Sequence, residues 1–215
     1  MATRGLQALR LLPPSEANFN LLTTAFNTRA ADEDRFRHEL LIEALARQKV
    51  ESFYPAATIW MQDNPNTLVR RTLVKTLAAD FSEAVVPILQ VALDDNDHIV
   101  RIRAAFGLVL AGGREHLDLL IEAARAKNVD IRNETITWLG IVPLLEVLNP
   151  VLESLTVSST QVRLAGIVRA HDIGERSALL QLMKLLEDKS TKVVEQAAVM
   201  LQSLVGKDLS FRWKG

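Results

Sequence analysis

The sequence has no cysteine, few aromatic residues and no long apolar run. Without cysteine, disulfides, thiol catalysis and thiolate metal sites are excluded. Hydrophobic residues make up 48% of the chain but aromatic residues only 5%, which suits close helix packing and disfavours a deep aromatic cofactor pocket. No run reaches the roughly 18 apolar residues of a membrane-spanning helix, and the N-terminal segment lacks the cleavage site of a secretory signal. We therefore expect a soluble, cytoplasmic protein.

Neither sign of charge is in excess. Lys and Arg total 25, and Asp and Glu total 26, so the net charge is -1. Proteins that bind nucleic acids usually carry a basic stripe, so this balance argues against such a partner. The four histidines show no two-histidine metal spacing, and no pattern orders Ser, His and Asp into a catalytic triad. We predict no metal, no cofactor and no catalytic residues.

What the sequence does have is a repeat. Pairs of Val-Arg or Ile-Arg recur every 31 residues: Val69-Arg70, Val100-Arg101, Ile131-Arg132 and Val162-Arg163. Val193-Val194 follows at the same interval. The first repeat is irregular, because Phe36-Arg37 precedes Val69-Arg70 by slightly more than this period. A short constant period indicates a stacked array of similar units, in which each unit contacts only its neighbours.

Each repeat predicts two helices. Apolar residues lie three, four or seven positions apart within each segment, on one face of a helix, and turns rich in Asn, Asp and Ser separate the segments. Such short turns require antiparallel helix pairs. We predict one all-α domain over 1–215, a right-handed α-α superhelix with a capping helix at 1–14, about six helix pairs at 15–206 and a tail at 207–215. The tail either packs over the last helix pair or engages a partner.

One repeat runs from an acidic turn through Val-Arg and a small-residue pair to an apolar helix end: Leu93-Asp94-Asp95-Asn96-Asp97-His98-Ile99-Val100-Arg101-Ile102-Arg103-Ala104-Ala105-Phe106-Gly107-Leu108. This segment resembles a HEAT repeat, and is most similar to the short bacterial kind found in phycobilisome lyases and their relatives. The resemblance covers roughly 15–206 and implies a HEAT/armadillo-like solenoid. In two departures from the pattern, Trp138 and Arg169 occupy the position of Gly107, and Val194 replaces the arginine of the last repeat.

The repeated arginines have two interpretations; they are Arg37, Arg70, Arg101, Arg132 and Arg163. As a positive stripe they would bind phosphate or carboxylate ligands. As a structural arginine ladder they would bind turn acids or carbonyls of an adjoining unit, as the resemblance to HEAT repeats implies. Asp95 and Asp188 each lie shortly before the first residue of a pair, Val100 and Val193, where such partners are needed. We favour the structural ladder, because constant spacing is what stacking requires.

A second residue set lies on the other side of the second helix of each repeat. Counted from the first residue of each pair, positions 2, 6 and 10 point away from the seam between helices. Several of these positions are apolar and form a strip: Ile102, Phe106, Leu110, Leu164, Val168 and Val199. Cations lie at one end of this strip: Arg71 and Lys75 at such positions, and the neighbouring Arg103. An exposed apolar patch with a charged rim marks an interaction surface, which we place on the concave face. Tight curvature that buries these residues, or a homodimer that covers them, are the alternatives.

The sequence therefore favours a non-catalytic scaffold that grips a protein segment, such as an amphipathic helix, in its concave face. The family resemblance implies an alternative, a phycobilin lyase or chaperone-like subunit that presents a tetrapyrrole to a phycobiliprotein. Trp60, Trp138 or His171 would then contribute to the bilin site, although no motif selects them.

Truncation of a seam residue tests the stacked arrangement. Leu108 lies in an apolar row shared by the second helices of the repeats. Leu108→Ala should lower the free energy of unfolding by about 2–5 kcal/mol, because it leaves a cavity between packed helices. Urea unfolding followed by circular dichroism measures this loss. A change below about 0.5 kcal/mol, the size typical of surface substitutions, would contradict a buried seam.

Overall fold

The computed structural model describes residues 11–28, 35–80, 82–139, 142, 145–173 and 176–205. Within these ranges the chain forms twelve α-helices and no strand, which confirms the predicted all-α solenoid class. Residues 11–14 form a turn and a bend. The rest of the predicted capping helix lies outside the described residues, as does the tail at 207–215. None of the described helices is both long and apolar enough to cross a bilayer.

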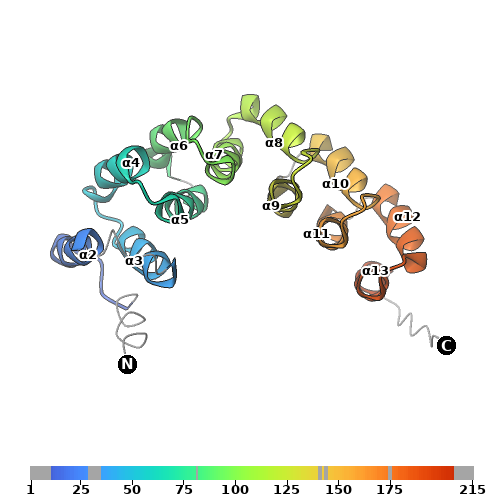
Figure 1. The fold of residues 1–215 in the computed structure, drawn as a ribbon. Helices are drawn as coiled ribbons and strands as arrows, with labels where there is room; N and C mark the ends of the chain where they lie inside the picture. Colours follow the sequence, from blue (N-terminus) through green and yellow to red (C-terminus); the bar gives the residue numbers. More distant parts are fainter. Residues whose placement is uncertain are drawn as a thin grey trace. The chain divides into compact units, whose positions relative to one another are not determined.

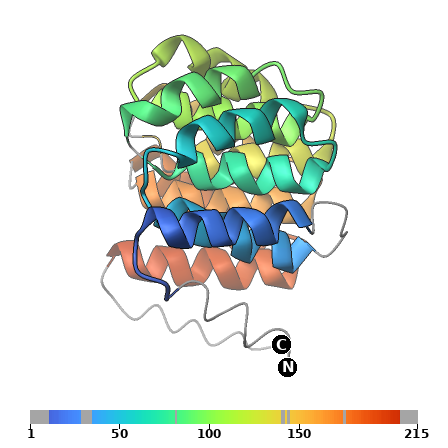
Figure 2. The same cartoon turned by 90° about the vertical axis from the view of Figure 1, so that its left-hand side faces the viewer.

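The chain divides into two compact units, which we call the N-terminal unit (1–116) and the C-terminal unit (117–215). The N-terminal unit contains α2 (Glu16–Thr28), α3 (Arg35–Arg47), α4 (Phe53–Asp63), α5 (Thr67–Ala78), α6 (Val86–Ala92) and α7 (His98–Leu110). In Figure 1, α2, α4 and α6 form one layer of this unit and α3, α5 and α7 form the other. α5 packs against both α3 and α7, and α4 packs against α6. Figure 2 shows α2 and α4, in dark blue and teal, as separate rods seen side-on.

The C-terminal unit repeats this arrangement with α8 (Leu117–Ala123), α9 (Val129–Leu139), α10 (Leu148–Ser154), α11 (Thr160–Ile173), α12 (Arg176–Lys184) and α13 (Thr191–Val205). Here α8, α10 and α12 form one layer, and α9, α11 and α13 form the other (Figure 1). α11 packs against both α9 and α13. Each of these three helices also packs against the helix that precedes it in the chain, as expected for antiparallel pairs.

Short polar turns start several of the odd-numbered helices. Asn66 precedes α5, and its side chain accepts a hydrogen bond from a backbone amide in the first turn of the helix. Asp97 does the same for two amides of α7, and Asn128 for two amides of α9. The caps satisfy amides that have no partner within the helix, so these turn residues fix where each helix begins.

The core of each unit is the seam between its two layers. In α5 the seam residues are Val69, Leu73 and Leu77, which are at most 1% exposed. The same register in α13 places Val193, Ala197 and Leu201 in buried positions. Residues four apart lie on one face of a helix, so one apolar stripe per helix is enough to build this seam.

Gly166 allows α11 to approach α10 closely. A β-carbon at this position would lie 2.1 Å from Oγ of Ser154 and 3.0 Å from Cδ2 of Leu155. Ser154 is buried, and its hydroxyl donates to the carbonyl of Val151 at 2.5 Å, which holds it in place. The close approach is therefore local to this pair of helices.

Substitution of Gly166 tests this contact. Gly166→Ala should lower the free energy of unfolding by up to about 2 kcal/mol. Overpacking costs about 1–3 kcal/mol, and the better helix propensity of alanine offsets about 1 kcal/mol of that cost. In a Ser154→Ala background the loss should shrink or reverse, because the hydroxyl that collides is gone. Urea unfolding of the four proteins gives the coupling between the sites. Equal effects of Gly166→Ala in both backgrounds would contradict the contact.

Candidate functional site

Two arginines of the ladder each pair with an aspartate in the turn of the following repeat. Arg70 on α5 makes a bidentate contact with Asp95, with Nε–Oδ2 at 2.6 Å and Nη2–Oδ1 at 3.1 Å. Arg163 on α11 donates to Oδ1 of Asp188 at 2.9 Å. Each arginine also donates to carbonyls in the turn before its own helix. The guanidinium therefore ties two successive turns together, and both pairs are largely buried.

The spacing along the chain explains which arginines of the ladder pair with an aspartate. Asp95 lies 25 positions after Arg70, and Asp188 lies 25 positions after Arg163. The same step from Arg101 and Arg132 reaches Ala126 and Val157, which have no carboxylate.

Arg101 and Arg132, which have no aspartate at this step, lie in other surroundings. The side chain of Arg101 contacts the carbonyl of Asp95 and the ring of His98. Nε of Arg132 is buried and has no hydrogen-bond partner. The side chain of Arg37 lies outside the described residues.

Two turn aspartates are held in the ionised form. Burial raises the pKa of Asp188, but hydrogen bonds from the amide of Ser190 and from Arg163 outweigh burial and leave the pKa below its usual value. Burial likewise raises the pKa of Asp97, and the hydrogen bonds from Arg71 and from the first amides of α7 again bring the net value down. A carboxylate stabilised in this way supports the fold above its unfolded pKa, and this support is lost as the pH falls through the lower folded pKa.

The cations expected at the end of the apolar strip are partly structural. Arg71 forms a bidentate ion pair with Asp97, at 2.8 Å for Nε–Oδ1 and 2.6 Å for Nη2–Oδ2. Arg103 donates to the carbonyl of Arg71 at 2.9 Å and so joins α7 to α5. Lys75 is exposed on α5. The two arginines therefore stabilise the packing of the N-terminal unit.

The expectation that Ile102 and Phe106 are exposed is wrong. Ile102 is 3% exposed and Phe106 is 2% exposed, and Leu110 at the end of α7 is half-buried. In a helix with one apolar stripe, these positions would be exposed. α7 instead carries buried apolar residues on every side, including Val100, Ala104, Ala105 and Val109, and a helix that is apolar all round is buried.

In the C-terminal unit the apolar strip does reach the surface. Val199 on α13 is 55% exposed. Leu164 and Val168 on the neighbouring helix α11 are half-buried. We call these three residues the α11–α13 strip.

A polar cluster lies beside the α11–α13 strip, and its contact with Ser203 is not predicted from the sequence. Nε2 of His171 lies 3.1 Å from Oγ of Ser203, and Nδ1 lies 3.4 Å from Oδ1 of Asp172. Asp172 also accepts from Arg169 at 2.7 Å. The sequence separation of 32 between His171 and Ser203, close to one repeat, is the only hint in the sequence.

The cluster has a Ser-His-Asp order but lacks a catalytic setting. Ser203 lies inside α13, where the backbone amides are engaged in the helix. A catalytic serine needs free amide donors to stabilise an oxyanion. We therefore interpret His171, Ser203 and Asp172 as a polar link between α11 and α13.

The two tryptophans suggested for a bilin site are each engaged within their own unit. Trp60 is buried in the core of the N-terminal unit, with its ring centroid 4.7 Å from that of Phe26. The indole of Trp138 donates to Glu134 on its own helix at 2.7 Å. In the described part of the chain, no group of three or more His, Cys, Asp or Glu side chains is placed to hold a metal ion.

Comparison with known proteins agrees with the helical-repeat architecture. Residues 85–170 match the family model described as HEAT repeats, without singling out the phycobilisome lyase type. The solved structure of Cex1p is 16% identical, with a TM-score of 0.52 over 87% of this chain and 42% of that chain, so this chain spans less than half of Cex1p. The structure of human deoxyhypusine hydroxylase in complex with glycerol is 18% identical, with a TM-score of 0.45 over 95% of this chain and 90% of that chain. No curated protein matches the sequence.

The interrupted ladder can be tested by adding the absent carboxylate. Val157→Asp places an acid 25 positions after Arg132, the same separation as between Arg70 and Asp95. Val157 lies in a turn and is half-buried. The substitution should raise the free energy of unfolding by about 1 kcal/mol, because the new carboxylate should accept a hydrogen bond from Arg132 as Asp188 accepts one from Arg163.

The control for this variant removes the arginine. In an Arg132→Met background, Val157→Asp should destabilise the protein, because the carboxylate is then half-buried without a partner. The double-mutant cycle, measured by urea unfolding, should give a coupling of about 1–2 kcal/mol. Absence of coupling between the two substitutions would show that this constant spacing does not govern the pairing.

Proposed function

We propose that this chain is a protein-binding scaffold whose α11–α13 strip holds an amphipathic helix of another protein. The observation that carries the proposal is the exposure of Val199 beside Leu164 and Val168. Stacked helical repeats present extended surfaces that bind other macromolecules. Amphipathic helices dock on such surfaces through apolar anchors spaced three, four or seven residues apart.

The spacing of the strip fits such an anchor row. On α11, Leu164 and Val168 are four residues apart and therefore lie on one face. On α13, Val199 lies between the buried seam residues Ala197 and Leu201 and points to the opposite side of the helix. Because α11 and α13 pack side by side, the three side chains offer apolar contacts from two adjacent helices to one bound helix.

Polar groups at one end of the strip can set the register of the partner. The His171–Ser203 contact links α11 to α13, and Asp172 pairs with Arg169 close by. Polar groups around an apolar centre exclude wrong partners and fix orientation more than they add affinity. The proposal therefore assigns affinity to the strip and selectivity to this polar end.

The proposal moves the binding surface away from the N-terminal unit. Ile102 and Phe106 are buried, and Arg71 and Arg103 are engaged in the packing of α5 and α7. Truncation of these four residues would damage the fold before it reported on any partner. Binding is therefore tested at Val199 on α13, which is exposed and can be substituted without removing a buried contact.

The surface can be tested with a photo-crosslinking residue at position 199. Leu180 on α12 is the matched control, because it is 58% exposed in the same unit and lies on the side of α12 opposite its buried residues Ala178 and Leu182. In lysate of the cells that express the protein, crosslinks at position 199 should map to one helical peptide of a partner, and position 180 should give none. Equal crosslinking at both positions, or crosslinks only to a second copy of this chain, would overturn the proposal.

Substitution then measures the contribution of the strip. Val199→Asp should weaken binding of the crosslinked helical peptide at least about tenfold, because a charge replaces an apolar anchor at the centre of the contact. Leu180→Asp should leave the affinity unchanged. Both positions are exposed, so both variants should keep the wild-type melting temperature and helical content. Equal affinity of the wild type and Val199→Asp would remove the strip as the binding surface.

A further inference from the structure

The N-terminal unit contains a cavity of about 430 Å³ between the C-terminal ends of α3 and α5 and the start of α4. Its lining has an apolar part that includes Phe53 and Leu77, both nearly fully buried. It also has charged side chains: Glu43, Arg47 and Lys49 come from α3 and the turn after it, and Asp80 comes from the turn after α5. A volume of this size lies within the range of small-molecule sites.

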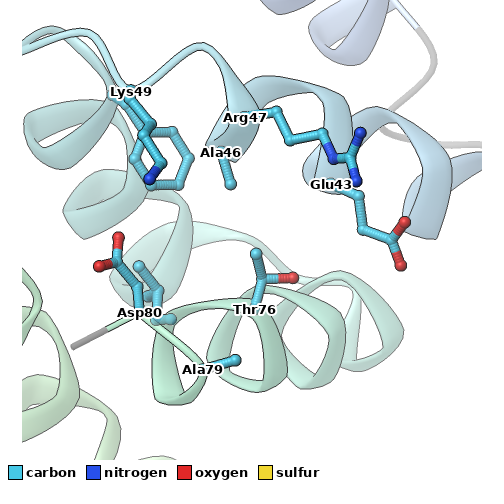
Figure 3. Close-up of a pocket in the computed structure, with 9 residues that line it drawn as sticks. Glu43, Ala46, Arg47, Lys49, Thr76, Ala79 and Asp80 are labelled. Carbon is cyan, nitrogen blue, oxygen red and sulfur yellow. The ribbon is translucent and has the colours of Figure 1, made fainter. Parts of the chain in front are cut away.

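The charges of this cavity are arranged across it. Figure 3 shows Lys49 and Asp80 on opposite walls with their charged ends directed toward each other. They do not form an ion pair, and within the described part of the chain the side chains of Lys49 and Arg47 have no hydrogen-bond or ion-pair partner. Asp80 accepts one hydrogen bond, from the amide of Ser82 at 3.0 Å, through Oδ1. An ammonium and a carboxylate that face each other without contact leave room for a ligand that carries both opposite charges.

The backbone at Lys49 supports a role for its side chain. Lys49 follows α3 and has a φ of 48°, and among the described residues it is the one non-glycine residue with a positive φ. Glycine is the residue that usually ends a helix in this conformation, because a β-carbon is strained there. Strain of this kind tends to occur where a side chain must be held at a ligand site.

The irregular repeat spacing falls at the same place. The step from the arginine of α3 to that of α5 is longer than the constant step between the later arginines of the ladder. The turn that contains Lys49 and the first residue of α4, Phe53, lie within this longer repeat. The longer repeat therefore contains two of the residues that line the cavity, Lys49 and Phe53.

We infer that this cavity binds a zwitterionic ligand with an apolar side chain, an α-amino acid or a dipeptide with both termini free. The ligand carboxylate is bound by Lys49, and its ammonium by Asp80. Its side chain lies against the apolar wall formed by Ala46, Phe53, Leu77 and Ala79. Because Lys49 and Asp80 face each other, a simple anion would meet a like charge at Asp80 and a simple cation would meet one at Lys49. This inference stands apart from the proposed function, which concerns α11 and α13.

The ligand chemistry can be tested by isothermal titration calorimetry on the full chain with the dipeptide Leu-Leu. The blocked forms N-acetyl-Leu-Leu and Leu-Leu amide each remove one of the two charges. The free dipeptide should bind, and each blocked form should bind at least about tenfold more weakly, since a factor of ten in affinity corresponds to about 1.4 kcal/mol. No heat of binding with millimolar Leu-Leu, or equal affinity for all three peptides, would overturn the inference.

Variants assign each charge to its side chain. Asp80→Asn should bind Leu-Leu and N-acetyl-Leu-Leu equally, and Lys49→Met should bind Leu-Leu and Leu-Leu amide equally. Lys49→Gly should weaken Leu-Leu at least about tenfold while raising the melting temperature, because glycine relieves the positive φ. Affinity and stability then change in opposite directions, which unfolding cannot produce.

Lys75→Met is the matched control, because Lys75 is an exposed lysine on α5 that does not line the cavity. Its affinity for Leu-Leu should equal that of the wild type. A loss as large as that of Lys49→Met would show a general charge effect and overturn the assignment.

Discussion

The structure depends on the apolar seam that each helix shares with its neighbours in the stack. A single helix pair cannot bury its apolar surface alone, so the stacked neighbours must cover it. In α5 the apolar stripe is Val69, Leu73 and Leu77, and it is buried because α5 packs against α3, α4 and α7 together. The seam fixes the register of every helix, and so it decides which side chains remain for polar contacts and binding.

The arginine–aspartate pairs add specificity to this seam. Arg70–Asp95 and Arg163–Asp188 each join a helix to the next turn at the same spacing. A buried pair of this kind offsets its desolvation only when further hydrogen bonds satisfy the guanidinium. The turn carbonyls provide such bonds to both arginines, but Nε of Arg163 is buried without a partner. The pair therefore fixes how successive turns are placed more than it increases the total stability.

The fold could be predicted from the sequence because the Val-Arg period, the apolar rows and the turn residues all indicate the same helices. The sequence could not decide whether the outer face of α7 is exposed or buried, since its apolar strip fitted either an interaction surface or burial; Ile102 and Phe106 are buried. The two candidate sites depend on juxtaposition. His171 meets Ser203 across α11 and α13, and Lys49 faces Asp80 across a cavity. No local sequence pattern encodes either juxtaposition.

Native-state hydrogen exchange of the backbone amides tests the stacked seam most directly. If stability comes from contacts between neighbouring helix pairs, the opening free energies should be graded. They should be highest in α5 and α11, which have a neighbour in their own layer on each side, and lower in α2 and α13. A single opening free energy shared by all helices from α2 to α13 would show one indivisible core and contradict the account.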